Sequence, residues 1–212
     1  MDEIKPSFEH LRNEVAQISY KWELYKSIYN EESIDLLNKT SAVVFSELQS
    51  LLFQSMILSI SKLYDSKEIA GNKNLSLKYL SSLADKYCDE AFSNDLNSSI
   101  NETKKSIDKI IKARHKRIAH LDLDTALCKT VTKTSIVTKN DINYALTQTY
   151  EIMNKIDRKL FDNTTFYGDI IMPIESGAGE LLRWLKKGVA YDRMEKEGLI
   201  ESGRWKETER SG

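Results

Sequence analysis

Residues that break helices are nearly absent from the first three-quarters of this 212-residue chain, and this constrains its fold more than any other feature. Proline occurs only at Pro6 and Pro173, and up to Phe166 the chain contains a single glycine, Gly71. Because proline and glycine disfavour helix interiors most strongly, long stretches without them favour helices. The sequence therefore predicts an all-α fold, with a boundary near residues 163–170, where glycines return.

Apolar residues recur at spacings of three and four, which is typical of amphipathic helices packed around a core. The first predicted helix, after Ser7, carries such a stripe at Phe8, Leu11, Val15, Ile18, Trp22 and Tyr25. Further helices are expected over residues 40–64, 76–87, 93–119, 140–161 and 179–197, with a short helical segment that Ser33 opens. The helix over 40–64 is apolar around much of its girth, so we expect it at the centre of the bundle or buried in a dimer.

Two local patterns refine this prediction. Thr138 and Asp141 have the spacing of a capping box, which would open the helix near residue 140. Residues 130–138 are rich in β-branched side chains, so this stretch is expected to be extended. We expect residues 1–163 to form a helical bundle and residues 164–212 to form a C-terminal extension with one helix.

Composition excludes several classes of protein. Apolar residues make up 41% of the chain and charged residues 30%, which indicates a globular protein and not a disordered one. The net charge is −1, so any nucleic-acid contact must come from a local basic patch. The isolated Cys88 and Cys128 argue against a zinc site or a disulfide framework and suit a reducing, cytoplasmic location. Polar residues interrupt the apolar stretch 48–63, which predicts a buried helix and no membrane association.

The basic helix that ends near residue 120 carries the candidate chemistry. On a helical wheel its isoleucines fall on one side and most of its lysines on the other. Arg114 falls among the isoleucines, where an unpaired charge is costly, so it requires an anion or a set of acceptors. Two interpretations stay open: an internal salt bridge, for example to Asp65, or a phosphate-binding arginine in a cleft or at a dimer seam.

His120 follows Arg114 after five intervening residues. Histidine exchanges a proton near neutral pH, so an arginine and a histidine together supply a phosphate clamp and a proton-transfer group without a metal. In an unbroken helix, however, the two side chains would point about 120° apart. They meet at one phosphate only if the helix ends or loosens near Ala119, or if two copies of the chain meet there.

These residues resemble the signature of the HEPN superfamily (higher eukaryotes and prokaryotes nucleotide-binding domains), in which an arginine precedes a histidine by four to six residues. The string Arg117-Ile118-Ala119-His120-Leu121-Asp122 resembles the abortive-infection-type branch. Residues 59–65, 74–77 and 138–142 also resemble that branch, and the resemblance covers roughly residues 8–162.

The resemblance implies a helical bundle that dimerises with two motifs facing each other, and in many members a metal-independent cleavage of RNA. It further implies that His120 acts as a general acid or base, that Arg114 stabilises charge on the phosphate, and that His115 supports them. We accordingly expect a toxin or antiphage-defence endoribonuclease that acts as a homodimer, with RNA as substrate and an antitoxin or regulatory protein as a further partner. No metal and no other cofactor is expected.

Three further cations, Lys112, Lys116 and Arg117, are expected to bind the RNA backbone. Asp122 stands where a subgroup of family toxins has a tyrosine that a partner nucleotidyltransferase modifies, so that form of control is not supported. The alternatives are a non-catalytic module that binds RNA or nucleotides, and a helical bundle for protein interaction. The last helix, with its apolar stripe, is expected to pack on the bundle or on the dimer mate, or else to dock a partner.

Overall fold

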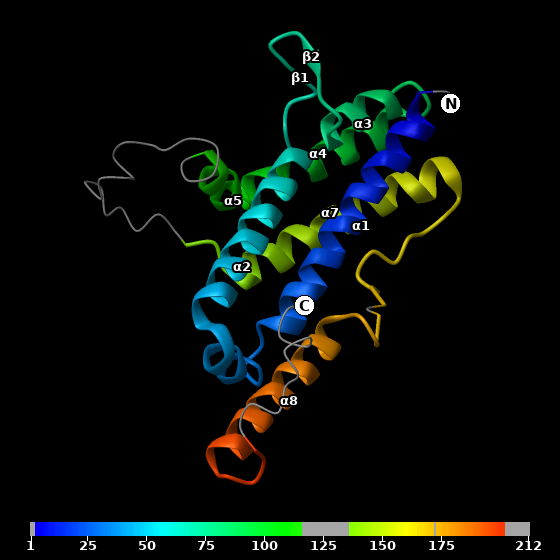
Figure 1. Ribbon diagram of the computed structural model, residues 1–212. Coiled ribbons are helices and arrows are strands. Elements are labelled where there is room, and N and C mark those ends of the chain that lie inside the picture. Colours follow the sequence, from blue (N-terminus) through cyan, green and yellow to red (C-terminus); the bar gives the residue numbers. More distant parts are fainter. Residues whose placement is uncertain (1–2, 116–135, 172, 202–212) are drawn as a thin grey trace, which may run out of the picture. The chain divides into compact units, whose positions relative to one another are not determined.

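A computed structural model describes residues 3–115, 136–171 and 173–201 of the chain. Its elements are α1 (Ile4–Ile28), α2 (Ile34–Leu63), β1 (Glu68–Ile69), β2 (Asn72–Lys73), α3 (Leu77–Ala84), α4 (Glu90–Ser106), α5 (Asp108–Ala113), α7 (Lys139–Phe161) and α8 (Ala178–Lys196) (Figure 1). Helices make up nearly all of the regular structure in the described residues, and the prediction of an all-α, HEPN-like bundle is confirmed.

The chain divides into two compact units, and α1 and α2 each have residues in both. The first unit comprises residues 1–23 and 50–171, and the second comprises residues 24–49 and 172–212. The first unit contains α3, α4, α5 and α7, whereas the second contains α8. The division predicted at residue 163 stays a prediction.

In the first unit, the apolar stripe of α1 is buried as its spacing predicted. Its members from Phe8 to Trp22 are at most 3% exposed. Polar groups at the rim of this face then tie α1 to α7. The Ser19 and Tyr150 hydroxyls lie 2.7 Å apart, and Trp22 Nε1 donates a hydrogen bond of 2.6 Å to Asn143 Oδ1. Burial of the stripe therefore supplies the driving force, and these bonds fix the register of the two helices.

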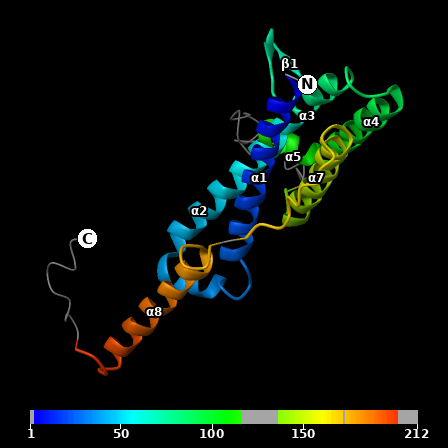
Figure 2. The same ribbon diagram turned by 90° about the vertical axis from the view of Figure 1, so that its right-hand side faces the viewer.

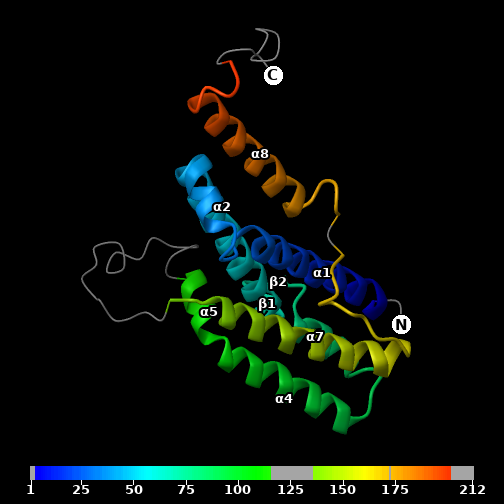
Figure 3. The same ribbon diagram turned by 90° about the horizontal axis from the view of Figure 1, so that it is seen from below.

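Helices α4 and α7 run side by side and antiparallel in the same unit (Figures 2 and 3). Charged pairs join the start of α4 to the end of α7: Lys159 Nζ lies 2.8 Å from Asp89 Oδ2, and Lys155 Nζ lies 2.7 Å from Asp95 Oδ2. Between them, the buried Ile100 and Ile152 contribute to the core. The candidate site is built on this pair of helices.

Two features of the first unit differ from the sequence prediction. The helix expected to run unbroken over 93–119 is divided at Ile107 (φ −94°, ψ 13°) into α4 and α5. The loop expected around Gly71 is the turn of a short hairpin, in which Glu68 pairs with Lys73 (Figure 1). Ala70 (φ 51°) and Gly71 (φ 80°) both adopt the left-handed conformation, as the tight turn of a two-residue hairpin requires.

Helix α2 is buried along only part of its length. Met56 is fully buried and Leu63 is 4% exposed, whereas Val44 is 53% and Leu51 is 60% exposed. The stretch 41–51 of this helix is therefore mostly exposed in a single chain, and the alternative of burial in a dimer stays a prediction. The separate segment expected after Ser33 is continuous with α2, but Ser41 (φ −159°, ψ 74°) kinks the helix near the expected junction.

By length and composition, α2 is the one described helix that could cross a membrane. An 18-residue window of it has a mean hydropathy of 1.5, and 17% of that window is buried. Core helices of soluble proteins meet the same criterion, so the predicted absence of membrane association stays a prediction.

In the second unit, aromatic side chains make the contacts within residues 24–49 and within α8. The rings of Tyr25 and Tyr29 lie 5.2 Å apart, and the Tyr29 hydroxyl donates a hydrogen bond of 3.0 Å to the carbonyl of Phe45. On α8, Lys187 Nζ lies 4.5 Å above the ring of Trp184, which is 57% exposed. The first two contacts lie within residues 24–49, and the third lies within α8. None of them tests whether α8 packs on the bundle or docks a partner, so its role stays a prediction.

Candidate nucleic-acid site

The end of α2 is anchored in the core by Tyr64. Its side chain is 1% exposed, and its hydroxyl lies 2.9 Å from Thr149 Oγ1 of α7. Burial raises the pKa of Tyr64, and interactions with Thr149 and with Thr103 of α4 offset part of the rise. One residue further along the chain, Asp65 is thereby held at the edge of the core, where it interacts with Lys104 of α4.

Asp65 pairs with Arg114, the arginine that the sequence placed among isoleucines. Arg114 NH1 lies 2.6 Å from Asp65 Oδ1, and the two side chains are only 18% and 23% exposed. Of the two interpretations left open, the internal salt bridge to Asp65 is therefore present. It does not satisfy the whole guanidinium, because Arg114 Nε is buried without a hydrogen-bond partner among the described residues.

Two features set the position of Arg114: the break in the helix at Ile107 and an ion pair that joins α5 to α7. Helix α5 packs on the core through Ile110, which is fully buried. On the same helix, Lys109 Nζ lies 2.8 Å from Asp141 Oδ2. Together these contacts fix α5 against the start of α7, so the residue that follows α5 is directed toward the end of α2.

Asp141 also completes the capping box that the sequence predicted. Thr138 Oγ1 accepts a hydrogen bond from the Asp141 amide, and the Asp141 carboxylate accepts one from the Thr138 amide at 2.6 Å. Burial alone would raise the pKa of Asp141, but hydrogen bonds from Lys109 and Thr138 outweigh this and lower it. One carboxylate therefore starts α7 and holds α5 in place.

The lysines of α4 and α5 fall into two groups, those with an ion-pair partner and those without one in the described residues, which the sequence did not distinguish. Lys112, a predicted substrate-binding residue, pairs with Asp108 at 2.6 Å on the surface, and Lys109 is paired with Asp141. Lys104 of α4 is half-buried and forms no ion pair within the described part of the chain. It lines an open surface cavity of about 600 Å³, together with Asn101, Lys105, Asp108 and Ile111.

Burial lowers the pKa of Lys104, and the neighbouring positive charge of Lys78 lowers it further, whereas Asp65 counteracts both. Lys78, on α3, is also half-buried. Sequence reasoning missed these two lysines. The helical wheel placed Lys104 outside the lysine stripe, and no local pattern connects it with Lys78, because only the packing of α3 against α4 brings them together.

Of the remaining predicted site residues, the structure describes only His115. His115 directly follows Arg114 and is exposed. His120, Lys116 and Arg117 lie outside the described residues, as does the stretch 130–135 that was expected to be extended. Within the described ranges, no group of histidine, cysteine, aspartate or glutamate side chains could hold a metal ion.

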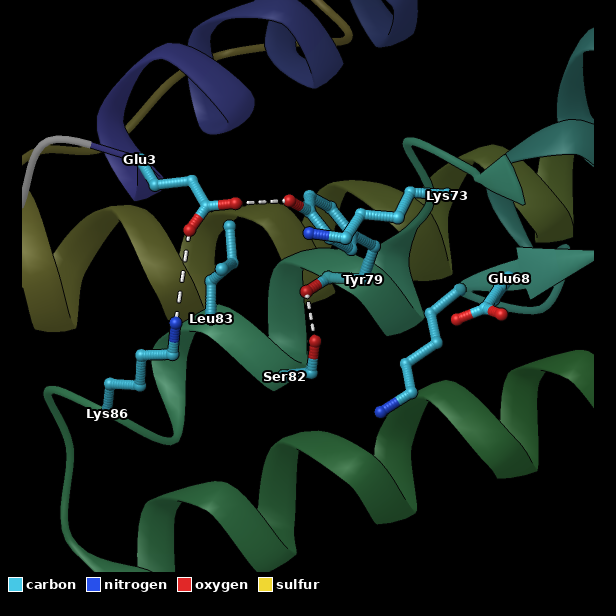
Figure 4. A pocket seen from close by; sticks show the side chains of 8 residues that line it. Glu3, Glu68, Lys73, Tyr79, Ser82, Leu83 and Lys86 are labelled. Atoms are coloured by element: carbon cyan, nitrogen blue, oxygen red, sulfur yellow. Dashed lines mark hydrogen bonds and ion pairs between the residues drawn. The ribbon is translucent and has the colours of Figure 1, made fainter. Parts of the chain in front are cut away.

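A second cavity, of about 300 Å³, lies between the hairpin, α3 and the start of α1 (Figure 4). Two of its side chains interact with one carboxylate: Tyr79 donates a hydrogen bond of 2.6 Å to Glu3, and Lys86 lies 3.9 Å from the same group. The hydrogen bond from Tyr79, with smaller effects of Lys86 and Lys73, lowers the pKa of Glu3. Because two carboxylates, Glu3 and Glu68, line this cavity, it is a weaker candidate for an anionic ligand than the surroundings of Arg114.

A helical bundle with an arginine at the end of a basic helix is what the resemblance to the HEPN superfamily implies. The family model HEPN_AbiU2, whose description reads AbiU2, matches residues 1–178. This match spans most of the chain, so the chain belongs to the HEPN_AbiU2 family. Comparisons with curated proteins and with solved structures gave no match.

Proposed function

We propose that this protein is a metal-independent endoribonuclease of toxin or antiphage-defence type, which cleaves RNA at a composite site formed by two copies of the chain. The observation that carries the proposal is the state of Arg114. Its guanidinium is largely withdrawn from water, one nitrogen is paired with Asp65, and Nε is left without a partner in the described structure. A phosphate oxygen satisfies such a nitrogen in the geometry that arginine favours.

In the proposed reaction, His120 takes the proton of a ribose 2′-hydroxyl as a general base. The 2′-oxygen attacks the adjacent phosphorus while the bond to the 5′-oxygen breaks, and the leaving 5′-oxygen takes a proton from water. Arg114 stabilises the charge that develops on the phosphate. The products are a 2′,3′-cyclic phosphate and a free 5′-hydroxyl, and no metal takes part.

One observation favours an alternative, a helical bundle without catalysis for binding or protein interaction. Such a bundle would hold Arg114 in an internal ion pair, and Asp65 provides one at 2.6 Å. The two proposals differ in what His120 does, because a structural role for Arg114 gives that histidine no chemical task.

The deciding experiment incubates the purified full chain with mixed RNA and EDTA and analyses the ends of the products. We expect cleavage by the wild type and at least a hundredfold loss in His120→Ala and Arg114→Ala, the range typical of a lost acid–base group. His10→Ala is the matched control, because His10 is an exposed histidine on α1 far along the chain from the motif. Cleavage that survives in His120→Ala, or that EDTA abolishes, would refute the mechanism.

A further inference from the structure

Lys78 and Lys104 lie on surfaces of α3 and α4 that face each other. Ser81 Oγ of α3 and Asn97 Oδ1 of α4 are 3.0 Å apart, which marks where the two helices touch. Lys78 precedes Ser81 by three residues and Lys104 follows Asn97 by seven, so each lies near the touching face of its helix. The packing of two helices therefore concentrates two positive charges in one place.

The same region includes Arg114 and Asp65, the acid that offsets part of the lowering of the Lys104 pKa. Asp108, which lines the same cavity as Lys104, is paired with Lys112. Thr103, directly before Lys104, contacts the hydroxyl of Tyr64, so α4 is held beside the chain segment that carries Asp65. Asp65 is already bound to Arg114 at 2.6 Å. Arg114 and Lys104 thus both interact with one carboxylate, and Lys78 lies close enough to Lys104 to repel it, so the excess of positive charge favours binding of an anion.

We propose that Lys78 and Lys104 form a second phosphate-binding position, next to the one at Arg114, for the backbone of single-stranded RNA. This inference rests on the proposed function for its choice of ligand. The half-buried Lys104 lines an open cavity, which gives a backbone phosphate access to it. An incoming phosphate would also relieve the repulsion between the two lysines, which adds to the effect of burial in lowering the pKa of Lys104.

Binding is tested apart from cleavage with a short 2′-O-methyl RNA, which lacks the attacking hydroxyl. Fluorescence anisotropy measures its affinity for the full chain in EDTA over a range of salt concentrations. In the double variant Lys78→Gln/Lys104→Gln we expect affinity at low salt to fall about tenfold, as for a lost charge-assisted hydrogen bond. The slope of log K against log salt should become shallower by about 0.7, the value for one phosphate of a single strand.

The matched control is Lys5→Gln/Lys39→Gln, which removes the same total charge from two exposed lysines. We expect little change in affinity or slope from it, and near wild-type affinity from Lys78→Arg/Lys104→Arg. The inference is wrong if the control weakens binding equally, if the glutamine pair binds like the wild type, or if the wild type does not bind the RNA. It is also wrong if polyglutamate of equal charge binds as tightly, because the surface would then be a general anion patch.

The two proposals fail in different ways. If the wild type binds the 2′-O-methyl RNA through these lysines but does not cleave ordinary RNA, the nuclease proposal fails and the phosphate-binding position stands. If it cleaves RNA and the glutamine pair has no effect on binding, the reverse holds. Thermal unfolding of each variant checks that the helical fold is retained.

Discussion

The ion pair between Asp65 and Arg114 should contribute measurably to stability because both side chains are largely buried. Two unit charges about 4 Å apart interact by about 4 kcal/mol at an effective dielectric constant of about 20. Their exposed fractions of 18% and 23% admit some solvent, and desolvation opposes the attraction. We therefore expect Asp65→Asn to lower the free energy of unfolding by about 1–2 kcal/mol, in the range for hydrogen bonds to charged groups.

A double-mutant cycle isolates this interaction. The free energies of unfolding of the wild type, Asp65→Asn, Arg114→Met and the double variant are measured in urea at pH 7 and at one protein concentration. We expect a coupling energy of about 1–2 kcal/mol, because neither residue keeps its partner after the other is changed.

The protein contains a control with the same geometry and different burial. Lys112 and Asp108 are also 2.6 Å apart, but their side chains are 64% and 53% exposed. The cycle between Lys112→Gln and Asp108→Asn should give at most about 0.5 kcal/mol. Equal coupling energies for the two pairs, or additive effects of Asp65 and Arg114, would refute the argument that burial strengthens the pair.

Two further predictions concern Tyr64 and Asp141, which hold the helices around Arg114 in place. Tyr64→Phe should destabilise the protein by about 1 kcal/mol, because Thr149 then loses a buried partner; unchanged urea unfolding would contradict this. Asp141 has a pKa below its ordinary value of 3.8, so its contribution to stability is present above that pH and is lost as the pH falls through its lower, folded-state pKa. Asp141→Asn should thus destabilise the protein at pH 7, through weaker contacts with Lys109 and Thr138, and the difference from the wild type should narrow below about pH 4. A gap that is constant with pH would disprove the assignment.

Local signals in the sequence predicted the parts of the fold that depend on neighbouring residues. The stripe that begins at Phe8 specified α1, although the helix starts earlier, at Ile4, since Pro6 is tolerated in a first turn. Thr138 and Asp141 specified the start of α7, because a capping box needs only residues three apart.

Features that depend on distant residues were predicted less well. The unbroken wheel placed Arg114 toward the core, which is correct, but it could not show that the helix is divided at Ile107, where packing overrides helix propensity. The partner of Arg114 was named only as an example, and Lys78 gave no signal at all, because its neighbour Lys104 is reached only through tertiary structure.

The sequence showed the apolar content of the helix over 40–64, but it left open whether the bundle or a second copy of the chain covers it. Periodicity distinguishes a polar face from an apolar one, but it does not say what covers an apolar face. In the single chain Met56 is covered and Leu51 is not.

The position of Tyr64 couples the stability of the protein to the chemistry at Arg114. The residue that joins three helices in the core is the immediate neighbour of the acid that holds Arg114, so no linker separates the two. Substitutions that loosen the packing around this tyrosine would shift the arginine before they unfold the chain. In a library of random mutants, substitutions of the residues packed around Tyr64 should therefore lower the melting temperature and impair any reaction at Arg114 at the same time.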